Sequence, residues 1–295
     1  MKLVIINDEH NPECEILFVK AAKKRKIPIE ITNSKIRMES VSPIKREKGL
    51  LVYRIATNPA EELLETIMLA KSATSLREPK QLLGKEGNEL FMMRKGKLRM
   101  NLILEKGGVV IPKTIFSNAD DEKSMKVIVK KLGLPLLIKT LGSSKGKGVI
   151  LIDSFFGLRS SAEALLEKNI PFFYQEFVKE AAGSHIRAIV LDGKLICAYR
   201  KWVSKKSDFR SNSSGGLSTN KLVKLNPATE KMAIEATRAS GLALGGVDLI
   251  KLSKNTYSVA EVNFPFNFAR SEELGKFDVA GKIIDYLVKK AQQKS

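Results

Sequence analysis

The order of apolar and polar residues in the first third of the chain predicts alternating strands and helices. Apolar residues recur with helical spacing within Glu13–Lys26 and again within Ala60–Ala70. The β-branched apolar runs beside these helices predict the strands Lys2–Asn7, Ile27–Thr32 and Leu50–Ile55. Because strands and helices in alternation are typical of a parallel α/β unit, residues 1–92 are expected to form a small N-terminal domain.

The middle of the chain, residues 93–171, shows a second set of elements. A basic amphipathic helix over Met93–Lys106 is expected to end at the two glycines that follow it. Ser117–Asp120 resembles a capping box that opens a helix over Asp121–Leu132. The remaining predicted elements are the strands Val109–Phe116, Leu134–Thr140 and Val149–Asp153 and a helix through Ala162–Lys168. They predict a compact α+β subdomain.

Residues 172–295 are expected to form a second α+β subdomain. Asp192-Gly193 stands between two β-like runs and is the strongest short signal for a hairpin. A helix is expected from Ala228, with Gly241 just after its end. The other predicted elements are the strands Phe172–Val178, Ile186–Leu191, Lys194–Tyr199, Gly246–Lys251 and Tyr257–Val262, a polar loop Ser204–Thr219 and a final helix Val279–Gln292.

Composition favours a soluble globular protein, with 43% hydrophobic and 28% charged residues. No apolar run approaches the roughly 20 residues of a membrane span, and the chain starts directly with a predicted strand, so neither a membrane segment nor a signal peptide is expected. Cys14 and Cys197 lie far apart without a Cys or His cluster. This usage favours a reducing compartment, by default the cytoplasm, and argues against a zinc site.

The net charge of +19 favours a polyanionic partner such as a nucleic acid, nucleotide phosphates or an acidic peptide. Much of the excess lies in short runs of Lys and Arg, which solvated helix faces also produce without any ligand. Aromatic residues make up only 6% of the chain, so a stacking platform for single-stranded nucleic acid is not indicated. Charge alone does not choose among these partners.

A glycine-rich loop, Gly142–Gly148, separates two predicted strands of the middle subdomain. Glycines allow backbone N–H groups to approach a phosphate chain, while serine and lysine side chains add donors and charge. The loop lacks the helix that follows a Walker A motif and does not match a Rossmann fingerprint. It is therefore interpreted as a loop that covers phosphates, with a plain flexible hairpin as the alternative.

Three oxygen-bearing side chains stand on two strands that are expected to pair. Glu261 and Asn263 alternate with apolar residues and so share one face, and a hairpin partner can place Asp248 opposite them. Carboxylate and amide oxygens are ligands suited to Mg²⁺. The alternative is that all three are ordinary solvent-facing positions. Beside a phosphate-covering loop, however, metal ligands indicate phosphoryl transfer.

Two further segments carry polar groups. Gln175–Val178, followed by His185 and Arg187, forms a strand edge that could hydrogen-bond an adenine. The long polar loop Asp208–Gly216 contains Arg210, whose guanidinium suits phosphate or carboxylate, and Asn212, a neutral donor. Irregular loops of about a dozen residues are usually functional or disordered.

Taken in order, seven segments resemble the signatures of the RimK family of ATP-grasp ligases, which add glutamate to the carboxyl end of a ribosomal protein or extend cofactors and carrier proteins. The resemblance covers about residues 90–288. Its segments read KLR from Lys97, PLLIK ending at Lys139, GSSKGKG from Gly142, QEFVKEAAGSHIR from Gln175, DFRSN from Asp208, GGVD ending at Asp248 and EVN ending at Asn263. It implies an α/β chain of the α+β ATP-grasp type, in which two α+β subdomains clamp ATP behind a small parallel α/β domain.

The resemblance also implies a role for each matching residue. The ATP-binding set is Lys97, Lys139, Gly142, Ser143, Ser144, Gly146, Gly148, Glu176, Phe177, Val178, His185, Arg210, Ser211 and Asn212. The set for the γ-phosphate and the substrate carboxylates is Arg187, Arg200, Arg210 and Asn212. The metal set is Asp248, Glu261 and Asn263, for two Mg²⁺ ions or Mn²⁺. The implied reaction joins a carboxylate to an amine through an acyl phosphate.

The implied activity is an ATP-dependent ligase that adds glutamate or another amino acid to a protein, peptide or cofactor carboxylate. The basic charge suits an acidic peptide or protein tail. Two alternatives stay open, namely a small-metabolite ligase of the glutathione synthetase type and a nucleic-acid- or ribosome-binding protein on a degenerate ATP-grasp scaffold. Family members are commonly oligomers, so a homo-oligomer is expected.

Three departures from the family pattern fall near the acceptor side. His185 stands where the family usually has aspartate, and the Ser211–Gly216 loop is one residue short and lacks a basic residue. Phe264–Phe268 replaces the usual loop of small residues, Pro and Gly. A more aromatic pocket beside the metal site is therefore expected.

Overall fold

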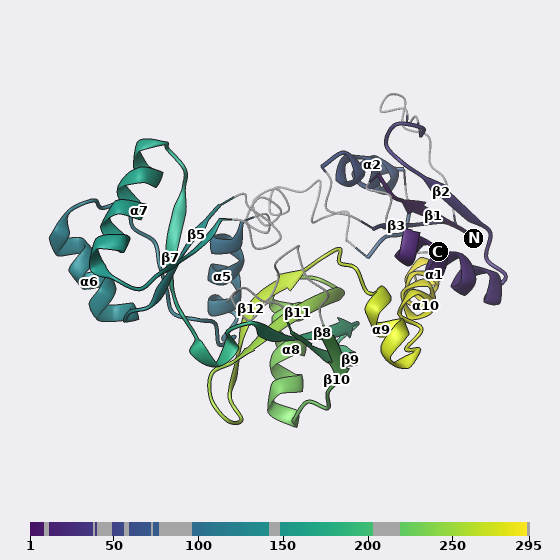
Figure 1. Cartoon of the computed structure of the whole chain (residues 1–295). Helices are drawn as coiled ribbons and strands as arrows, with labels where there is room; N and C mark the ends of the chain where they lie inside the picture. Colours follow the sequence, from purple (N-terminus) through teal and green to yellow (C-terminus); the bar gives the residue numbers. More distant parts are fainter. Residues whose placement is uncertain are drawn as a thin grey trace.

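The structure, a computed structural model of the whole chain, contains three sheets with helices packed against them (Figure 1). It describes residues 1–8, 12–37, 39, 49–55, 59–71, 73–76, 96–141, 148–202 and 219–293. Both ends of the chain lie in the unit built on the first sheet, while the other two sheets form the rest of the molecule.

The N-terminal unit is a parallel sheet with the strand order β2-β1-β3. Its strands are β1 (Lys2–Ile6), β2 (Ile29–Thr32) and β3 (Leu50–Arg54), and its helices are α1 (Pro12–Lys24) and α2 (Pro59–Ala70). The prediction of a parallel strand–helix–strand opening is therefore confirmed. All of β3 is buried, including the charged Arg54, because helices cover the sheet and α2 presents glutamates to it.

The middle unit is an antiparallel sheet in the order β4-β7-β5-β6, with α6 and α7 on one face. Its elements are β4 (Thr114–Ile115), α6 (Glu122–Leu132), β5 (Leu136–Thr140), β6 (Val149–Ile152), α7 (Phe155–Glu167) and β7 (Phe172–Glu176). Alternate residues of β5 pack against the helices, and the residues between them, among them Lys139, face the opposite side.

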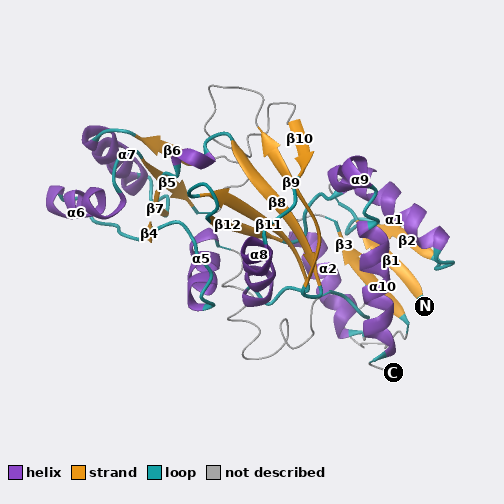
Figure 2. Cartoon of the chain, turned by 90° about the horizontal axis from the view of Figure 1, so that it is seen from below, coloured by secondary structure: helices purple, strands orange, loops and turns teal. Residues whose placement is uncertain are grey.

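The third sheet is antiparallel, in the order β10-β9-β8-β11-β12. Its strands are β8 (Ser184–Leu191), β9 (Lys194–Trp202), β10 (Thr219–Leu222), β11 (Leu244–Lys251) and β12 (Tyr257–Asn263), and the short helix η1 (Lys179–Ala181) precedes them. Helices α5 (Lys97–Lys106) and α8 (Pro227–Ala239) cover one face and share a core with it, as Figure 2 shows for α8. Helix α5, although close to the middle unit in sequence, packs on this sheet.

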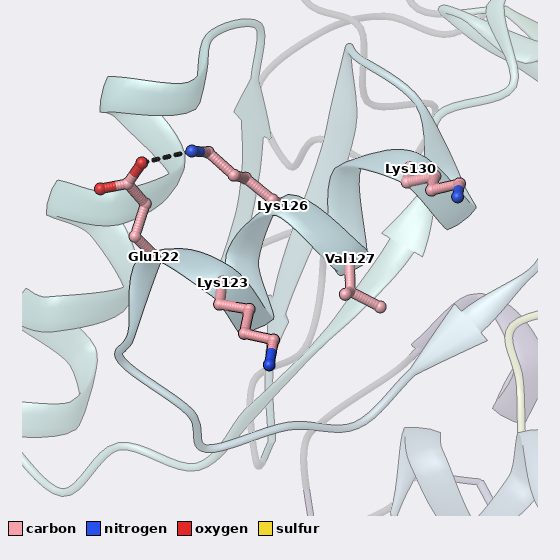
Figure 3. A pocket seen from close by; sticks show the side chains of 5 residues that line it. All are labelled: Glu122, Lys123, Lys126, Val127 and Lys130. Atoms are coloured by element: carbon pink, nitrogen blue, oxygen red, sulfur yellow. Dashed lines mark ion pairs between the residues drawn. The ribbon is translucent and has the colours of Figure 1, made fainter.

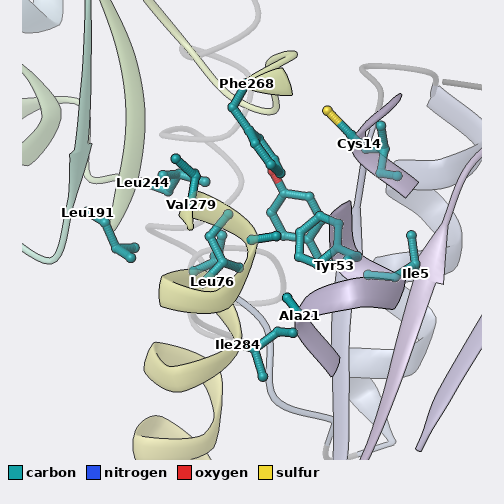
Figure 4. Packing of buried hydrophobic residues seen from close by; sticks show 14 of the residues in the cluster. Ile5, Cys14, Ala21, Tyr53, Leu76, Leu191, Leu244, Phe268, Val279 and Ile284 are labelled. Atoms are coloured by element: carbon teal, nitrogen blue, oxygen red, sulfur yellow. The ribbon is translucent and has the colours of Figure 1, made fainter. Parts of the chain in front are cut away.

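The last two helices return to the N-terminal unit. Helices α9 (Ala269–Gly275) and α10 (Val279–Gln292) share a core with β1, β3 and α1 that also includes the far ends of β8 and β9. Phe268 and Tyr53 both pack against Phe18 in this core, and Figure 4 shows them together with Ile284 of α10 and Ala21 of α1. The N-terminal unit is therefore joined to the five-stranded sheet by apolar packing as well as by the chain.

Several predicted boundaries are wrong for identifiable reasons. The cap of α6 is Asp121, whose carboxylate accepts from the Ser124 amide, whereas the Ser117 hydroxyl accepts from Ala119. The strand expected over Val109–Phe116 shrinks to two residues, since Pro112 has no amide hydrogen for a ladder. Helix α7 begins at Phe155, earlier than expected, and α9 was not predicted.

Other predictions are confirmed. The Asp192-Gly193 hairpin forms with both residues at positive φ, Gly241 follows the cap of α8 at φ +65°, and α10 has the predicted bounds. The predicted loop Ser204–Thr219 lies, except for its last residue, outside the described residues. None of the helices described is long and apolar enough to cross a membrane.

Candidate active site

The five-stranded sheet has one apolar face and one face that carries charge. Ile186, Val247 and Val259 are buried against α5 and α8. Because side chains alternate along a strand, the residues between them point to the opposite face. The charged face carries His185, Arg187, Lys201, Asp248, Glu261 and Asn263.

The three predicted metal ligands come together on this face. Asp248 on β11 lies directly opposite Glu261 on β12, and Asn263 lies opposite Gly246 on the same pair of strands. The Asn263 amide donates to Asp248 Oδ2 at 3.2 Å and to the Gly246 carbonyl at 3.4 Å. The predicted alternation therefore places all three side chains at one end of the hairpin.

Asp248 is also the partner of a buried arginine. Arg187, opposite Asp248 on β8, donates from Nε to Oδ1 at 2.5 Å and from Nη2 to Oδ2 at 2.9 Å. Burial alone would raise the pKa of Asp248, but Arg187 and His185 hold it well below its usual range. Asp248 is therefore ionised at any physiological pH.

His185 lies two residues before Arg187 on the same face. Its Nε2 is 3.2 Å from Asp248 Oδ1, yet the ring is not oriented for a hydrogen bond, and neither ring nitrogen has a hydrogen-bond partner among the described residues. The buried imidazole thus lies beside the Asp248 carboxylate.

Two lysines approach Glu261 from other elements. Lys97 begins α5, and Lys139 lies on β5 of the middle unit, on the face that the helices do not cover. Burial raises the pKa of Glu261 and Asp248 adds to this effect, while Arg187, Lys97 and Lys139 oppose it. Burial lowers the pKa of Lys97, and Glu261 partly offsets that shift. The three sequence-distant charges therefore act on one another across two units of the fold.

Lys139 is held by a polar chain that runs across the middle sheet. Its Nζ donates to Gln175 Oε1 at 2.5 Å, and Gln175 Nε2 donates to Thr114 Oγ1 at 2.9 Å. Burial lowers the pKa of Lys139 to about 8. A lysine this poorly solvated is stabilised in its charged form by any anion that binds beside it.

The structure does not bring Arg200 to the charged face. Arg200 lies opposite Ile186, and its guanidinium is 5.9 Å from the Trp202 ring centroid and 3.5 Å from the Tyr257 hydroxyl. Its neighbour Lys201 takes the place opposite His185 instead. Burial, followed by repulsion from Arg187, lowers the pKa of Lys201. Lys201 is thus a cation of the site face that the sequence pattern did not predict.

The predicted adenine edge lies where the chain passes from the middle sheet to the five-stranded sheet. Glu176 ends β7, where its amide donates to the Lys113 carbonyl and its carboxylate accepts from the Lys113 amide, both at 2.9 Å. Phe177 follows, and Val178 caps η1. Of the phosphate loop only Gly148 is described. The residues Gly142, Ser143, Ser144, Gly146, Arg210, Ser211 and Asn212 lie outside the described residues.

The donor set on the charged face fits a divalent cation such as Mg²⁺. Two carboxylates and an amide oxygen are hard ligands, and the raised pKa of Glu261 marks a carboxylate that a cation would stabilise. Within the described ranges no group of three or more His, Cys, Asp or Glu side chains could hold a metal. A cation here would therefore depend on Asp248, Glu261 and Asn263 together.

A hollow on α6 is not part of this site. It is lined by Lys123, Lys126, Val127 and Lys130, with Glu122 paired to Lys126 at 2.6 Å (Figure 3). Helix α6 covers the face of the middle sheet opposite Lys139. The hollow is a basic outer surface of the middle unit.

The aromatic segment after Asn263 is largely buried in packing. Phe268 is fully buried, and Phe266 is 7% exposed. Phe264 lies edge-on to Tyr53, with ring centroids 6.3 Å apart. These contacts join the end of β12 to the N-terminal unit. The expectation of a more aromatic pocket beside the metal site stays a prediction.

Solved structures share this arrangement over nearly the whole chain. The ATP-grasp ligase PsnB, in complex with a phosphomimetic variant of its minimal precursor, Mg and ADP, aligns with a TM-score of 0.74 at 14% identity over 98% of both chains. The D-cycloserine synthetase DcsG aligns with a TM-score of 0.70 at 14% identity, over 99% of this chain and 100% of that one. The fold is therefore the ATP-grasp fold.

Sequence comparison then gives the family. Residues 94–287 match the RimK-like ATP-grasp domain, and the chain belongs to that family. A Hahella chejuensis protein named "Probable alpha-L-glutamate ligase 2" is 35% identical over 193 residues, which are 65% of this chain and 62% of the relative. An Aeromonas salmonicida protein named "Probable alpha-L-glutamate ligase" is 32% identical over 199 residues, which are 68% of this chain and 65% of the relative. The matched part is thus less than two thirds of each relative.

Proposed function

We propose that this protein is a cytoplasmic ATP-dependent ligase that joins a carboxylate to an amine through an acyl phosphate. The observation that carries the proposal is the meeting of Lys97 and Lys139 with Glu261 and Asp248. Two cations for a phosphate chain and two carboxylates for a metal come from separate elements and converge at one place. The fold alone does not require such a set, whereas phosphoryl transfer does.

In the first step, a substrate carboxylate oxygen attacks the γ-phosphorus of ATP. The bond from that phosphorus to the bridging oxygen breaks, and ADP leaves with its electron pair. In the second step, the nitrogen of a deprotonated amine attacks the acyl carbon. The carbon–nitrogen bond forms, and the bond from the acyl carbon to the oxygen that bridges it to phosphorus breaks. Phosphate leaves with that oxygen and its electron pair, and the nitrogen releases one proton to solvent. No covalent bond to the protein is needed.

The site residues would each stabilise charge at a defined stage. Lys97 and Lys139 would hold the phosphates, and Arg187 and Lys201 would face the transferred phosphoryl group and the substrate carboxylate. Asp248, Glu261 and Asn263 would hold Mg²⁺, with two ions as the family pattern implies, to neutralise charge on the β- and γ-phosphates. Phe177 and Val178 would take the adenine. Glycine-rich residues of the phosphate loop would exclude water from the acyl phosphate.

For the substrates, we propose glutamate or another amino acid as the amine and an acidic peptide or protein tail as the carboxylate. The relatives named glutamate ligases and the PsnB complex with its precursor support this choice. The net charge of +19 supports an acidic acceptor, because opposite charge steers the encounter. A small metabolite acid and a nucleic-acid partner are the competing outcomes.

A screen of amino acids and acceptor carboxylates, read by ADP release and by mass of the product, tests the activity. An amide product that disappears in Glu261→Ala supports the proposal. ATP hydrolysis without a product for any pair, together with salt-sensitive RNA binding, would instead favour a nucleic-acid-binding protein on this scaffold.

The acceptor class is tested by ionic strength. For a glutamate-rich peptide we expect KM to rise at least about threefold between about 50 and 300 mM salt, since a Debye length shrinks over that range. A neutral small acid should show no such rise. Two double variants remove equal charge from two different surfaces, namely Lys123→Ala with Lys130→Ala on α6 and Lys20→Ala with Lys24→Ala on α1. Comparing their KM for the peptide shows which of the two surfaces the peptide approaches. Equal turnover of the neutral acid and the peptide, without salt dependence, contradicts the acidic acceptor.

A further inference from the structure

A phenylalanine ring covers the arginine that holds Asp248. Phe266 lies three residues after Asn263, and the Arg187 guanidinium carbon is 5.6 Å from the centroid of its ring. The same guanidinium donates to both oxygens of Asp248, at 2.5 and 2.9 Å. Arg187 is thus bonded to the carboxylate and lies over the face of the Phe266 ring.

The backbone of β11 also limits the position of Phe266. A Cβ added to Gly246 would come within 2.8 Å of the ring, so the ring rests directly on the backbone of β11, two residues before Asp248. Only glycine leaves room for this approach. The ring fills the space over the strand that carries the carboxylate, beside an Arg187 that is itself buried.

The rest of the segment anchors Phe266 in the N-terminal unit. The Phe266 and Phe268 ring centroids are 6.4 Å apart, and Phe268 meets Phe18 of α1 at 5.7 Å. Two residues before Phe266, Phe264 lies over Arg54 at 5.5 Å. Phe266 is therefore packed against both the five-stranded sheet and the aromatic side chains of the N-terminal unit.

We propose that Phe266 is a positioning residue of the metal site, whose ring holds Arg187 in the orientation that aims the Asp248 carboxylate at the cation. Both Asp248 oxygens bond to Arg187, so whatever limits the motion of the guanidinium limits the motion of the carboxylate. This inference rests on the proposed assignment of Asp248 as a metal ligand. It adds a link from the core of the N-terminal unit, through Phe268 and Phe266, to that ligand.

The test measures the affinity of the full chain for Mn²⁺ in the presence of a non-hydrolysable ATP analogue. Electron paramagnetic resonance detects the bound Mn²⁺. Phe266→Leu keeps an apolar side chain but removes the aromatic face, and we expect it to weaken Mn²⁺ binding about fivefold. Phe266→Tyr keeps the face and should bind Mn²⁺ within about twofold of the wild-type protein. Analogue binding without metal should be unchanged in both variants.

Phe264→Leu is the matched control, because it removes a ring from Arg54 in the same segment. It should lower the thermal unfolding temperature without changing Mn²⁺ affinity. Equal loss of Mn²⁺ affinity in Phe264→Leu and Phe266→Leu, or no loss in Phe266→Leu, would overturn the proposal. So would Mn²⁺ binding that is absent from the wild-type protein or that survives Asp248→Asn. Because turnover is not measured, failure to find a ligase product leaves the result intact.

Discussion

Among the described residues, Arg54 of the N-terminal unit and Arg187 of the five-stranded sheet are both buried beside a buried carboxylate, and their surroundings differ. In the N-terminal unit, Arg54 Nε donates to Glu65 Oε2 at 2.9 Å, and the Ser75 hydroxyl donates to the other oxygen of Glu65. The pair joins β3 to α2 beneath the ring of Phe264. These hydrogen bonds tie elements of the N-terminal unit to one another.

In the five-stranded sheet, the pair Arg187–Asp248 lies next to Phe266, and charged residues from other units of the fold act on the carboxylate beside it. Glu261 stands opposite Asp248, and Lys139 of the middle unit acts on Glu261. Burial and Asp248 raise the pKa of Glu261, so a bound cation would stabilise its ionised form. Under the proposed function, the first pair serves the fold alone, whereas the second also serves a ligand.

The largest effect that would test this contrast is expected for Glu261→Gln. Removing a metal-binding carboxylate should lower ligase turnover by about a thousandfold, since charge on the transferred phosphoryl group loses its stabilisation. The raised pKa of Glu261 means that folding disfavours its ionised form at neutral pH. The same substitution should therefore raise the free energy of unfolding of the metal-free protein. Product assays measure turnover, and urea denaturation measures the unfolding free energy. A variant in which both turnover and the unfolding free energy fall would contradict the contrast.

The second effect concerns the pair in the N-terminal unit. Glu65→Leu removes the closer carboxylate from the buried Arg54 and leaves it with Glu62, which is more distant at 3.8 Å. Breaking a buried ion pair from one side costs about 3 kcal/mol of unfolding free energy. Turnover at a temperature where the variant is folded should change by less than about threefold, because this pair is not expected to bind substrate. Urea denaturation followed by circular dichroism gives the first quantity, and ADP release gives the second.

The sheet pattern was predictable because burial imposes it. The alternation of Glu261 and Asn263 with apolar residues placed both on one face, and the ladder with β11 confirmed Asp248 opposite Glu261. Helix α10 was predictable to the residue from its apolar spacing. In these cases local sequence and tertiary packing require the same arrangement.

The position of Arg200 was not predictable, because it depends on a bulge. From the Asp192-Gly193 turn, regular pairing would set Arg200 opposite His185, on the charged face. The register shifts by one residue between Ile189 and Val190, so Lys201 takes that place and Arg200 moves to the other face. A shift of one residue exchanges the faces of a strand, and no residue type in the hairpin marks it.

The third effect is a pH dependence that should belong to the active site alone. Lys139, with its pKa lowered to about 8, loses its proton as pH rises through that value and with it the attraction for phosphate. Nucleotide binding then takes up a proton, so the Kd of an ATP analogue should rise about tenfold from pH 7 to pH 9. Lys139→Arg, which stays charged, should flatten the profile. A profile unchanged in that variant would assign the dependence to another group.

The smallest effect should come from an arginine–carboxylate pair with a solvent-exposed carboxylate. Arg25, the residue after α1, donates to both oxygens of Asp285 on α10, at 2.6 and 2.8 Å, and the Asp285 side chain is 61% exposed. Solvent screens such pairs, so Arg25→Met should lower the unfolding free energy by only about 0.5–1 kcal/mol, and less at high salt. Nucleotide affinity should not change. Urea denaturation of this variant and of Glu65→Leu compares an exposed pair with a buried one. Equal losses of unfolding free energy would mean that burial does not set the strength of the Arg54 pair.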